Sequence, residues 1–136
     1  MKLLIDTNIY IDAMSGRMPW AAGAQALLTK IAEEKAIGCV SASSLSDIYY
    51  ILKKHLKSNE ITKQALVNLI TTIDILDVNG TDCKNAFNSP IDDYEDALLA
   101  CLGERHKVDY LVTRDSEHFK NSSIKVLDAD GALKLL

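Results

Sequence analysis

Short apolar runs alternate with segments of helical periodicity along the whole chain. Runs such as residues 3–5 and 110–112 are continuous and apolar, which is typical of strands buried on both faces of a parallel sheet. Apolar residues spaced three or four positions apart, as in residues 45–52, indicate amphipathic helices. We expect strands at residues 2–5, 39–40, 73–78, 110–113 and 124–127, and helices at residues 8–14, 19–38, 43–57, 61–70, 81–87, 92–107 and 129–136.

This alternation defines the expected fold class. Short strands that alternate with helices form parallel sheets with helices on both faces, and the connections between the strands are right-handed. We therefore expect one α/β domain over residues 1–136, a three-layer α/β/α sandwich around a central parallel sheet of about five strands.

Composition and charge narrow the class of protein. Of the 136 residues, 48% are hydrophobic, which is enough for one core, and no apolar run approaches the ~18 residues that span a bilayer. The N-terminus lacks the features of a secretory signal, so we expect a cytoplasmic protein. The widely spaced Cys39, Cys83 and Cys101 argue against a disulfide framework and a structural zinc site. The net charge of −4 is the wrong sign for holding nucleic acid through a basic surface alone, unless carboxylates bind divalent cations that reverse the local field.

Acidic residues recur where the predicted strands end. Asp6 directly follows the first strand, Asp115 closely follows the fourth, and Asp47 lies about one turn into the helix after the second. Asp96 and its neighbour Asp93 open the helix that leads into the fourth strand. These acids can converge on the carboxyl edge of the sheet, where ligands of such folds bind, and clustered carboxylates favour hard ions such as Mg²⁺ or Mn²⁺. Two plainer interpretations remain open: Asp6 as an N-cap and Asp47 as a helix-surface acid.

Four ordered segments carry a resemblance to a known family: LIDTN at residues 4–8, SASSLSDIYY at 41–50, YEDAL at 94–98 and LVTRD at 111–115. Together they resemble a PIN domain of the VapC toxin type, colinearly from residue 3 to about residue 127. The resemblance implies a compact α/β/α sheet and an Mg²⁺- or Mn²⁺-dependent endoribonuclease. It further implies the toxin of a toxin–antitoxin pair, with RNA as substrate, an antitoxin protein as partner and a homodimer as the assembly.

The resemblance also assigns roles to individual residues. It places the metal-binding acids of the family on four residues, Asp6, Asp47, Asp96 and Asp115. Accessory positions fall on Thr113, whose hydroxyl would orient a metal-bound water, on Asn8 beside the first acid, and on Asp93. We expect Asp6 and Asp96 to hold the principal cation and the other two acids to complete the set, so that an activated water attacks phosphorus.

Asp47 departs from the pattern of the family, in which the second acid is normally Glu. A carboxylate that is shorter by one methylene can leave a ligand position to water, which would weaken metal binding without abolishing it. Arg114, next to the acids, is our candidate for phosphate contact, whereas Asp92, Glu95 and the lysines of residues 53–57 are better interpreted as solvated ends of helices.

Two alternatives belong to other classes of function. A receiver-type phosphotransfer domain also gathers acids at a sheet edge, but it needs an acidic pair where this chain has Asp6 alone. A PIN-like fold with a nuclease weakened by Asp47 would act mainly as an RNA- or partner-binding module. Partner or dimer contacts would then involve the early helices, where Trp20, Tyr49 and Tyr50 are found.

Overall fold

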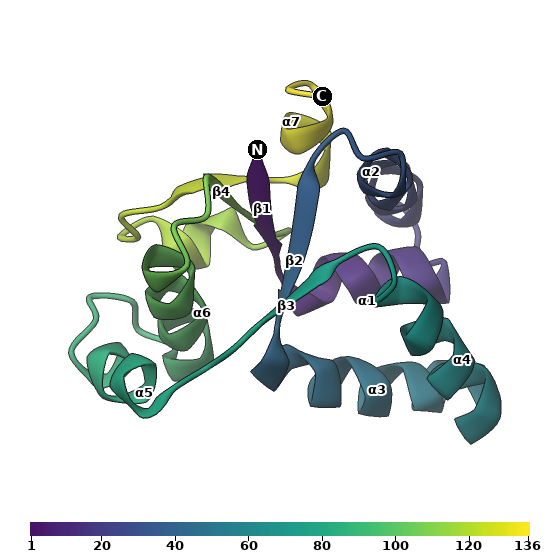
Figure 1. Cartoon of the computed structure of the whole chain (residues 1–136), viewed down its shortest axis with the longest axis horizontal. Helices are drawn as coiled ribbons and strands as arrows, with labels where there is room; N and C mark the ends of the chain where they lie inside the picture. The colour runs from purple at the N-terminus through teal and green to yellow at the C-terminus, as the bar shows by residue number, and fades with distance from the viewer.

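A parallel sheet forms the centre of the protein in the computed structural model, which describes residues 1–136. The sheet has five strands in the order β3-β2-β1-β4-β5, and every neighbouring pair is parallel (Figure 1). The strands are β1 Lys2–Ile5, β2 Ile37–Ser41, β3 Asp74–Leu76, β4 Tyr110–Val112 and β5 Lys125–Leu127. The chain moves from β1 to β2 on one side and later to β4 on the other, so β1 lies at the switch point where such sheets bind ligands.

Helices cover both faces of the sheet, which confirms the predicted three layers (Figure 1). One layer contains α1 Thr7–Ser15, α2 Ala21–Ala32, α3 Ala42–Leu56, α4 Asn59–Leu69 and α7 Ala129–Leu133. The other layer contains α5 Gly80–Phe87, α6 Tyr94–Arg105 and a short 3₁₀ helix, η1 Ser116–Phe119, which the sequence did not lead us to expect. None of the helices combines the length and the apolar character needed to cross a membrane.

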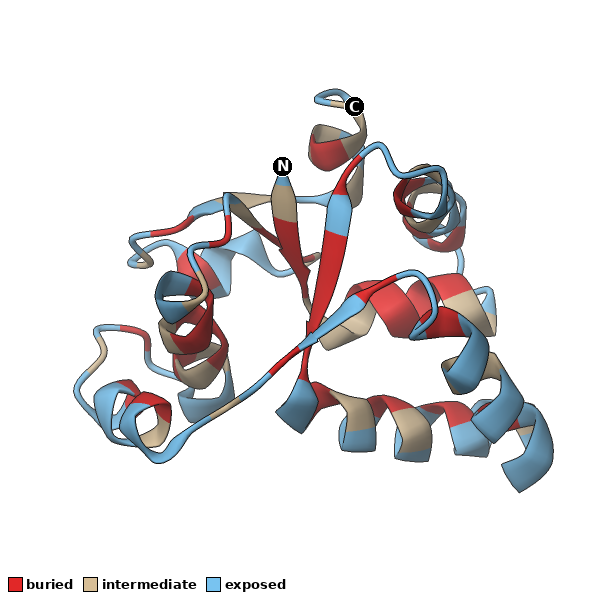
Figure 2. Ribbon diagram, in the orientation of Figure 1, coloured by how far each residue is buried: buried red, intermediate tan, exposed pale blue.

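The central strand β1 is buried from both sides, as its continuous apolar run predicted. Leu3 and Ile5 belong to the core beneath α1–α4 and α7, whereas Leu4 belongs to the core beneath α5 and α6. Successive side chains of a strand point to opposite faces, so both cores hold β1 in place. Figure 2 shows most of this strand in the colour of buried residues. The residue that follows Ile5 therefore has a fixed position at the carboxyl edge of the sheet.

Several helices begin at residues other than those predicted, because the start of a helix depends on which side chain reaches a free backbone N–H. Ser41 caps α3 in place of Ser43 or Ser44. The predicted helix at 92–107 begins at Tyr94, since the carboxylate of Asp93 accepts a hydrogen bond from the backbone N of Asp96 at 3.0 Å. Asp93 is thus a helix cap.

An ion pair ties α6 to α5. The guanidinium of Arg105 donates hydrogen bonds to both carboxylate oxygens of Asp82, from Nε at 2.9 Å and from Nη2 at 2.8 Å. Asp82 is buried, and the hydrogen bonds from Arg105 lower the pKa of its carboxyl. This contact holds the C-terminal end of α6, whose N-terminal end carries Asp96.

Candidate functional site

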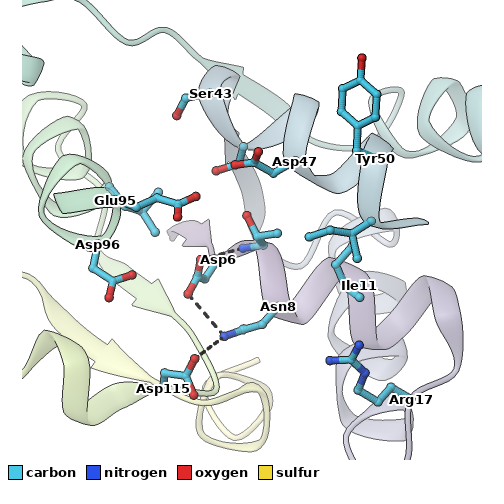
Figure 3. A pocket seen from close by; sticks show the side chains of 14 residues that line it. Asp6, Asn8, Ile11, Arg17, Ser43, Asp47, Tyr50, Glu95, Asp96 and Asp115 are labelled. Carbon is cyan, nitrogen blue, oxygen red and sulfur yellow. Dashed lines mark hydrogen bonds between the residues drawn. The ribbon is translucent and has the colours of Figure 1, made fainter. Parts of the chain in front are cut away.

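A cavity of about 480 Å³ lies at the carboxyl edge of the sheet, between α1, α3 and α6 (Figure 3). Fourteen residues line it, and five of them are acids: Asp6, Asp47, Glu95, Asp96 and Asp115. The structure therefore brings together all four acids that we expected to converge, and it adds Glu95. Arg17 is the one basic side chain in the lining.

Asp6 serves both as a helix cap and as part of the cavity. One carboxylate oxygen, Oδ1, accepts a hydrogen bond from the backbone N of Thr7 at 2.8 Å, and the other, Oδ2, accepts one from the hydroxyl of Thr113 at 2.8 Å. Burial raises the pKa of the Asp6 carboxyl, although the hydrogen bonds from Thr113 and Thr7 oppose this effect. The two interpretations of Asp6 are thus compatible, because capping uses only one of its oxygens.

Thr113 and Asn8 connect the first and last acids of the cavity. The buried Thr113 hydroxyl, which donates to Asp6, also accepts a hydrogen bond from the backbone N of Asp115 at 3.1 Å. The side-chain amide of Asn8 donates to Asp115 Oδ2 at 3.1 Å and approaches Asp6 Oδ2 at 3.5 Å (Figure 3). These contacts fix Asp6 and Asp115 relative to each other.

Asp96 enters the cavity from the first turn of α6. Burial raises the pKa of its carboxyl to about 6, and the negative charges of Asp93 and Asp6 add to the shift. His118 partly offsets it, with Nδ1 at 3.4 Å from Asp96 Oδ2. Near neutral pH the metal-free cavity therefore holds carboxylates that repel one another.

The raised pKa of Asp96, caused first by burial and then by neighbouring acids, predicts that Asp96→Asn makes the metal-free protein more stable. An acid whose pKa is raised by folding destabilises the native state above that pKa, and the penalty disappears as the pH falls towards the ordinary value. We expect a gain of roughly 1 kcal/mol in the free energy of unfolding at pH 7.5, less than the full shift implies because solvent screens the partly exposed side chain.

Chemical denaturation in EDTA at pH 7.5 and at pH 4.5 measures this difference. The gain should shrink at the lower pH, where the native wild-type protein already binds the proton. A loss of stability in Asp96→Asn at pH 7.5, or a gain that does not change with pH, contradicts the expectation.

Asp47 and Glu95 face each other across the cavity from α3 and α6 (Figure 3). Burial raises the pKa of the Glu95 carboxyl, and the neighbouring carboxyl of Asp47 adds to the shift. Glu95 is exposed in the first turn of α6, as we expect of a solvated helix acid, and the structure adds that it lines the cavity. Adjacent helix residues lie about 100° apart, so Asp96 and Glu95 can border the same cavity, which the spacing of residues alone does not reveal. Asp93 does not line the cavity.

The side chain of Arg114 points away from the acids, so the structure does not support our expectation that it contacts phosphate. Its Nε lies 2.9 Å from Oδ2 of the buried Asp12, and its guanidinium lies over the ring of Trp20, 3.9 Å from the centroid. Burial raises the pKa of Asp12, while Arg114 and Arg17 oppose that shift. Only the backbone N of Arg114 turns towards the site, where it donates to Asn8 Oδ1 at 3.3 Å.

The chemistry of the cavity fits a hard divalent cation. Its acidic lining offers oxygen donors and no Cys or His, which is the donor set of Mg²⁺ or Mn²⁺ rather than of zinc. No three or more His, Cys, Asp or Glu side chains are close enough together to form a ready ligand shell. The acids thus surround a shared space, and small side-chain movements would be needed to enclose an ion.

Comparison with known proteins identifies the family and the fold. Residues 2–117 match the family described as PIN domain. VapBC2 from Rickettsia felis, solved with a DNA fragment from its promoter, is similar at 17% identity with a TM-score of 0.69, covering 94% of this chain and 98% of that chain. VapBC-1 from nontypeable Haemophilus influenzae is similar at 18% identity and TM-score 0.67, covering 96% and 99%. VapC20 of Mycobacterium tuberculosis, a sarcin-ricin loop cleaving toxin, is similar at 11% identity and TM-score 0.64, covering 80% and 86%. No curated protein matches the sequence.

Proposed function

Because this chain belongs to the PIN-domain family, we propose that it is an Mg²⁺- or Mn²⁺-dependent endoribonuclease and the toxin of a toxin–antitoxin pair. The acidic cavity at the carboxyl edge of the sheet is its active site. One observation carries the proposal: acids from four separate segments meet around one space, with raised pKa values at Asp6 and Asp96 and one basic residue nearby. Family membership also removes the receiver-type alternative.

The proposed roles follow from how each acid is held. Asp6 and Asp96 would hold the principal cation, and Asp115 and Asp47 would complete its surroundings. A bound Mg²⁺ or Mn²⁺ supplies Lewis acidity, which activates water and stabilises negative charge on the phosphoryl oxygens. The Thr113 hydroxyl and the Asn8 amide keep Asp6 and Asp115 in register, so the reacting phosphate meets a fixed arrangement of charges.

The proposed partner is an antitoxin protein, and the proposed assembly is a homodimer. Two of the three similar structures reported above are VapBC complexes, which supports an antitoxin as the partner of this chain as well. Tyr50 is 59% exposed on α3 and borders the cavity, and Trp20 is 43% exposed before α2. A partner that covers Tyr50 would also cover part of the rim of the acidic cavity, whereas Trp20 lines a separate pocket.

The direct test is an RNA-cleavage assay. Purified protein is incubated with labelled single-stranded and structured RNA in Mg²⁺, in Mn²⁺ and in EDTA. We expect cleavage with either cation and none in EDTA. Undiminished cleavage in EDTA contradicts the proposed chemistry. RNA that is bound but left intact in every condition supports the alternative, a binding module without nuclease activity.

Arg17 replaces Arg114 as the predicted contact to the RNA backbone. It borders the acidic cavity, its side chain is 41% exposed, and its distance from Asp12 is 3.9 Å, too long for a strong ion pair. Arg17→Gln should therefore raise the KM for RNA by roughly fivefold with little change in kcat, and should reduce the salt dependence of binding by about one counterion.

Steady-state kinetics at two salt concentrations measure this effect, with Lys54→Gln as the matched control. Lys54 lies in the last turn of α3, outside the cavity, and its substitution should change the KM by less than about twofold. If the two substitutions have equal effects on the KM, Arg17 contributes only general surface charge, and the predicted contact with the RNA backbone is wrong.

A further inference from the structure

The second acid of the site, Asp47, has a short side chain. Asp47 is exposed on α3, and its side chain is one methylene shorter than the glutamate that PIN domains of this type normally carry there. Directly across the cavity, α6 presents the longer side chain of Glu95, whose carboxyl group extends towards Asp47 (Figure 3). Both side chains line the same cavity, so the carboxyl group of Glu95 lies opposite that of Asp47 (Figure 3).

Electrostatics makes this position of Glu95 unfavourable in the absence of a ligand. The charged neighbours that act on it are Asp47, Asp93 and Asp6, all of them acids. Glu95 lies in the first turn of α6, so the helix dipole would favour its charge equally well if the side chain pointed into solvent. No lysine, arginine or histidine pairs with Glu95. Glu95 is exposed, yet its carboxyl group borders the acidic cavity (Figure 3), and this position is the feature that needs an explanation.

We propose that Glu95 is a further metal-contacting residue of the active site, and that it supplies from α6 the reach that Asp47 lacks on α3. This inference rests on the proposed metal-dependent function of the cavity. Glu95 and Asp47 would then contact the same cation, with one carboxylate from α6 and one from α3. A bound cation would offset the negative charges of both carboxylates.

Calorimetric titration with Mn²⁺ in the absence of RNA tests the inference independently of activity. Glu95→Gln should weaken Mn²⁺ binding by at least about tenfold, as expected when a ligand or its direct support is lost. Asp92→Asn is the matched control, because it removes one negative charge next to the same helix from a side chain that does not line the cavity. We expect it to change the affinity by less than about twofold.

The double variant Glu95→Gln/Asp47→Glu tests whether side-chain length is what Glu95 contributes to metal binding. The second substitution leaves the charge unchanged and returns one methylene on the α3 side. It should recover most of the lost affinity if length is what Glu95 provides. Unchanged Mn²⁺ affinity in Glu95→Gln, a loss equal to that of Asp92→Asn, or no recovery in the double variant overturns the inference.

The same titration separates this inference from the proposed function. If the wild-type protein binds Mn²⁺ and Asp6→Asn does not, while Glu95→Gln binds normally, only the role of Glu95 fails. If the wild-type protein binds no Mn²⁺, or if Asp6→Asn binds it as well as wild type does, the metal site itself fails, and the inference about Glu95 fails with it.

Discussion

Asp6→Asn and Asp96→Asn should each reduce cation-dependent RNA cleavage by roughly 1000-fold, because each removes a charge that would hold the ion. Several kcal/mol of charge stabilisation in the transition state corresponds to a factor of this size. The fold should survive both changes, since asparagine can still accept the capping hydrogen bond of Asp6 from Thr7 and the side chain of Asp96 caps no helix. Single-turnover cleavage of labelled RNA, with circular dichroism as a check of folding, measures the effect.

Asp74→Asn is the matched control for these two variants. Asp74 is an exposed aspartate at the first residue of β3 and does not line the cavity, so its substitution should leave cleavage unchanged. Cleavage that persists in both site variants at the rate of the control would come from a contaminating nuclease or from another part of the surface, and the proposed site would be wrong.

Thr113→Val should reduce cleavage by roughly 10- to 100-fold, the usual effect of removing a side chain that orients a metal ligand. Valine has nearly the shape of threonine but no hydroxyl. The change removes the donor to Asp6 Oδ2 and leaves the backbone N–H of Asp115 without its acceptor. Because both acids lose a fixed contact, Mn²⁺ affinity should fall together with the rate of cleavage.

Thr113→Ser distinguishes loss of the hydroxyl from loss of packing. Serine keeps the hydroxyl and removes a buried methyl group, so it should be less stable than wild type yet retain most of the cleavage activity. The interpretation of Thr113 as a positioning residue is contradicted if Thr113→Val cleaves as wild type does, or if serine and valine lose activity equally.

The sheet was predictable because a strand that is buried on both faces appears in the sequence as a continuous apolar run. Leu3, Leu4 and Ile5 are all apolar because the two cores use alternate side chains of β1. Once such a strand is located, the residue after it must lie at the carboxyl edge, whatever its side chain does there. The meeting of Asp6 and Asp115 therefore followed from strand positions alone.

The directions of side chains in loops and first helical turns were not predictable in this way. Arg114 lies between two residues that face the site, yet its own side chain turns to Asp12 and Trp20, partners that no pattern in the sequence links to it. The sequence around Glu95 does not distinguish it from an ordinary acid at the start of a helix. Its position at the cavity depends on how α6 is rotated relative to α3, which the sequence pattern does not specify.

The central claim is that acids distant in sequence jointly hold one hard cation, and a crystal grown with Mn²⁺ tests it most directly. Anomalous diffraction locates manganese without reference to activity. We predict a peak in the cavity within roughly 2.2 Å of carboxylate oxygens of both Asp6 and Asp96. A well-diffracting crystal with no anomalous peak in the cavity, or with manganese bound only elsewhere on the protein, would contradict the account.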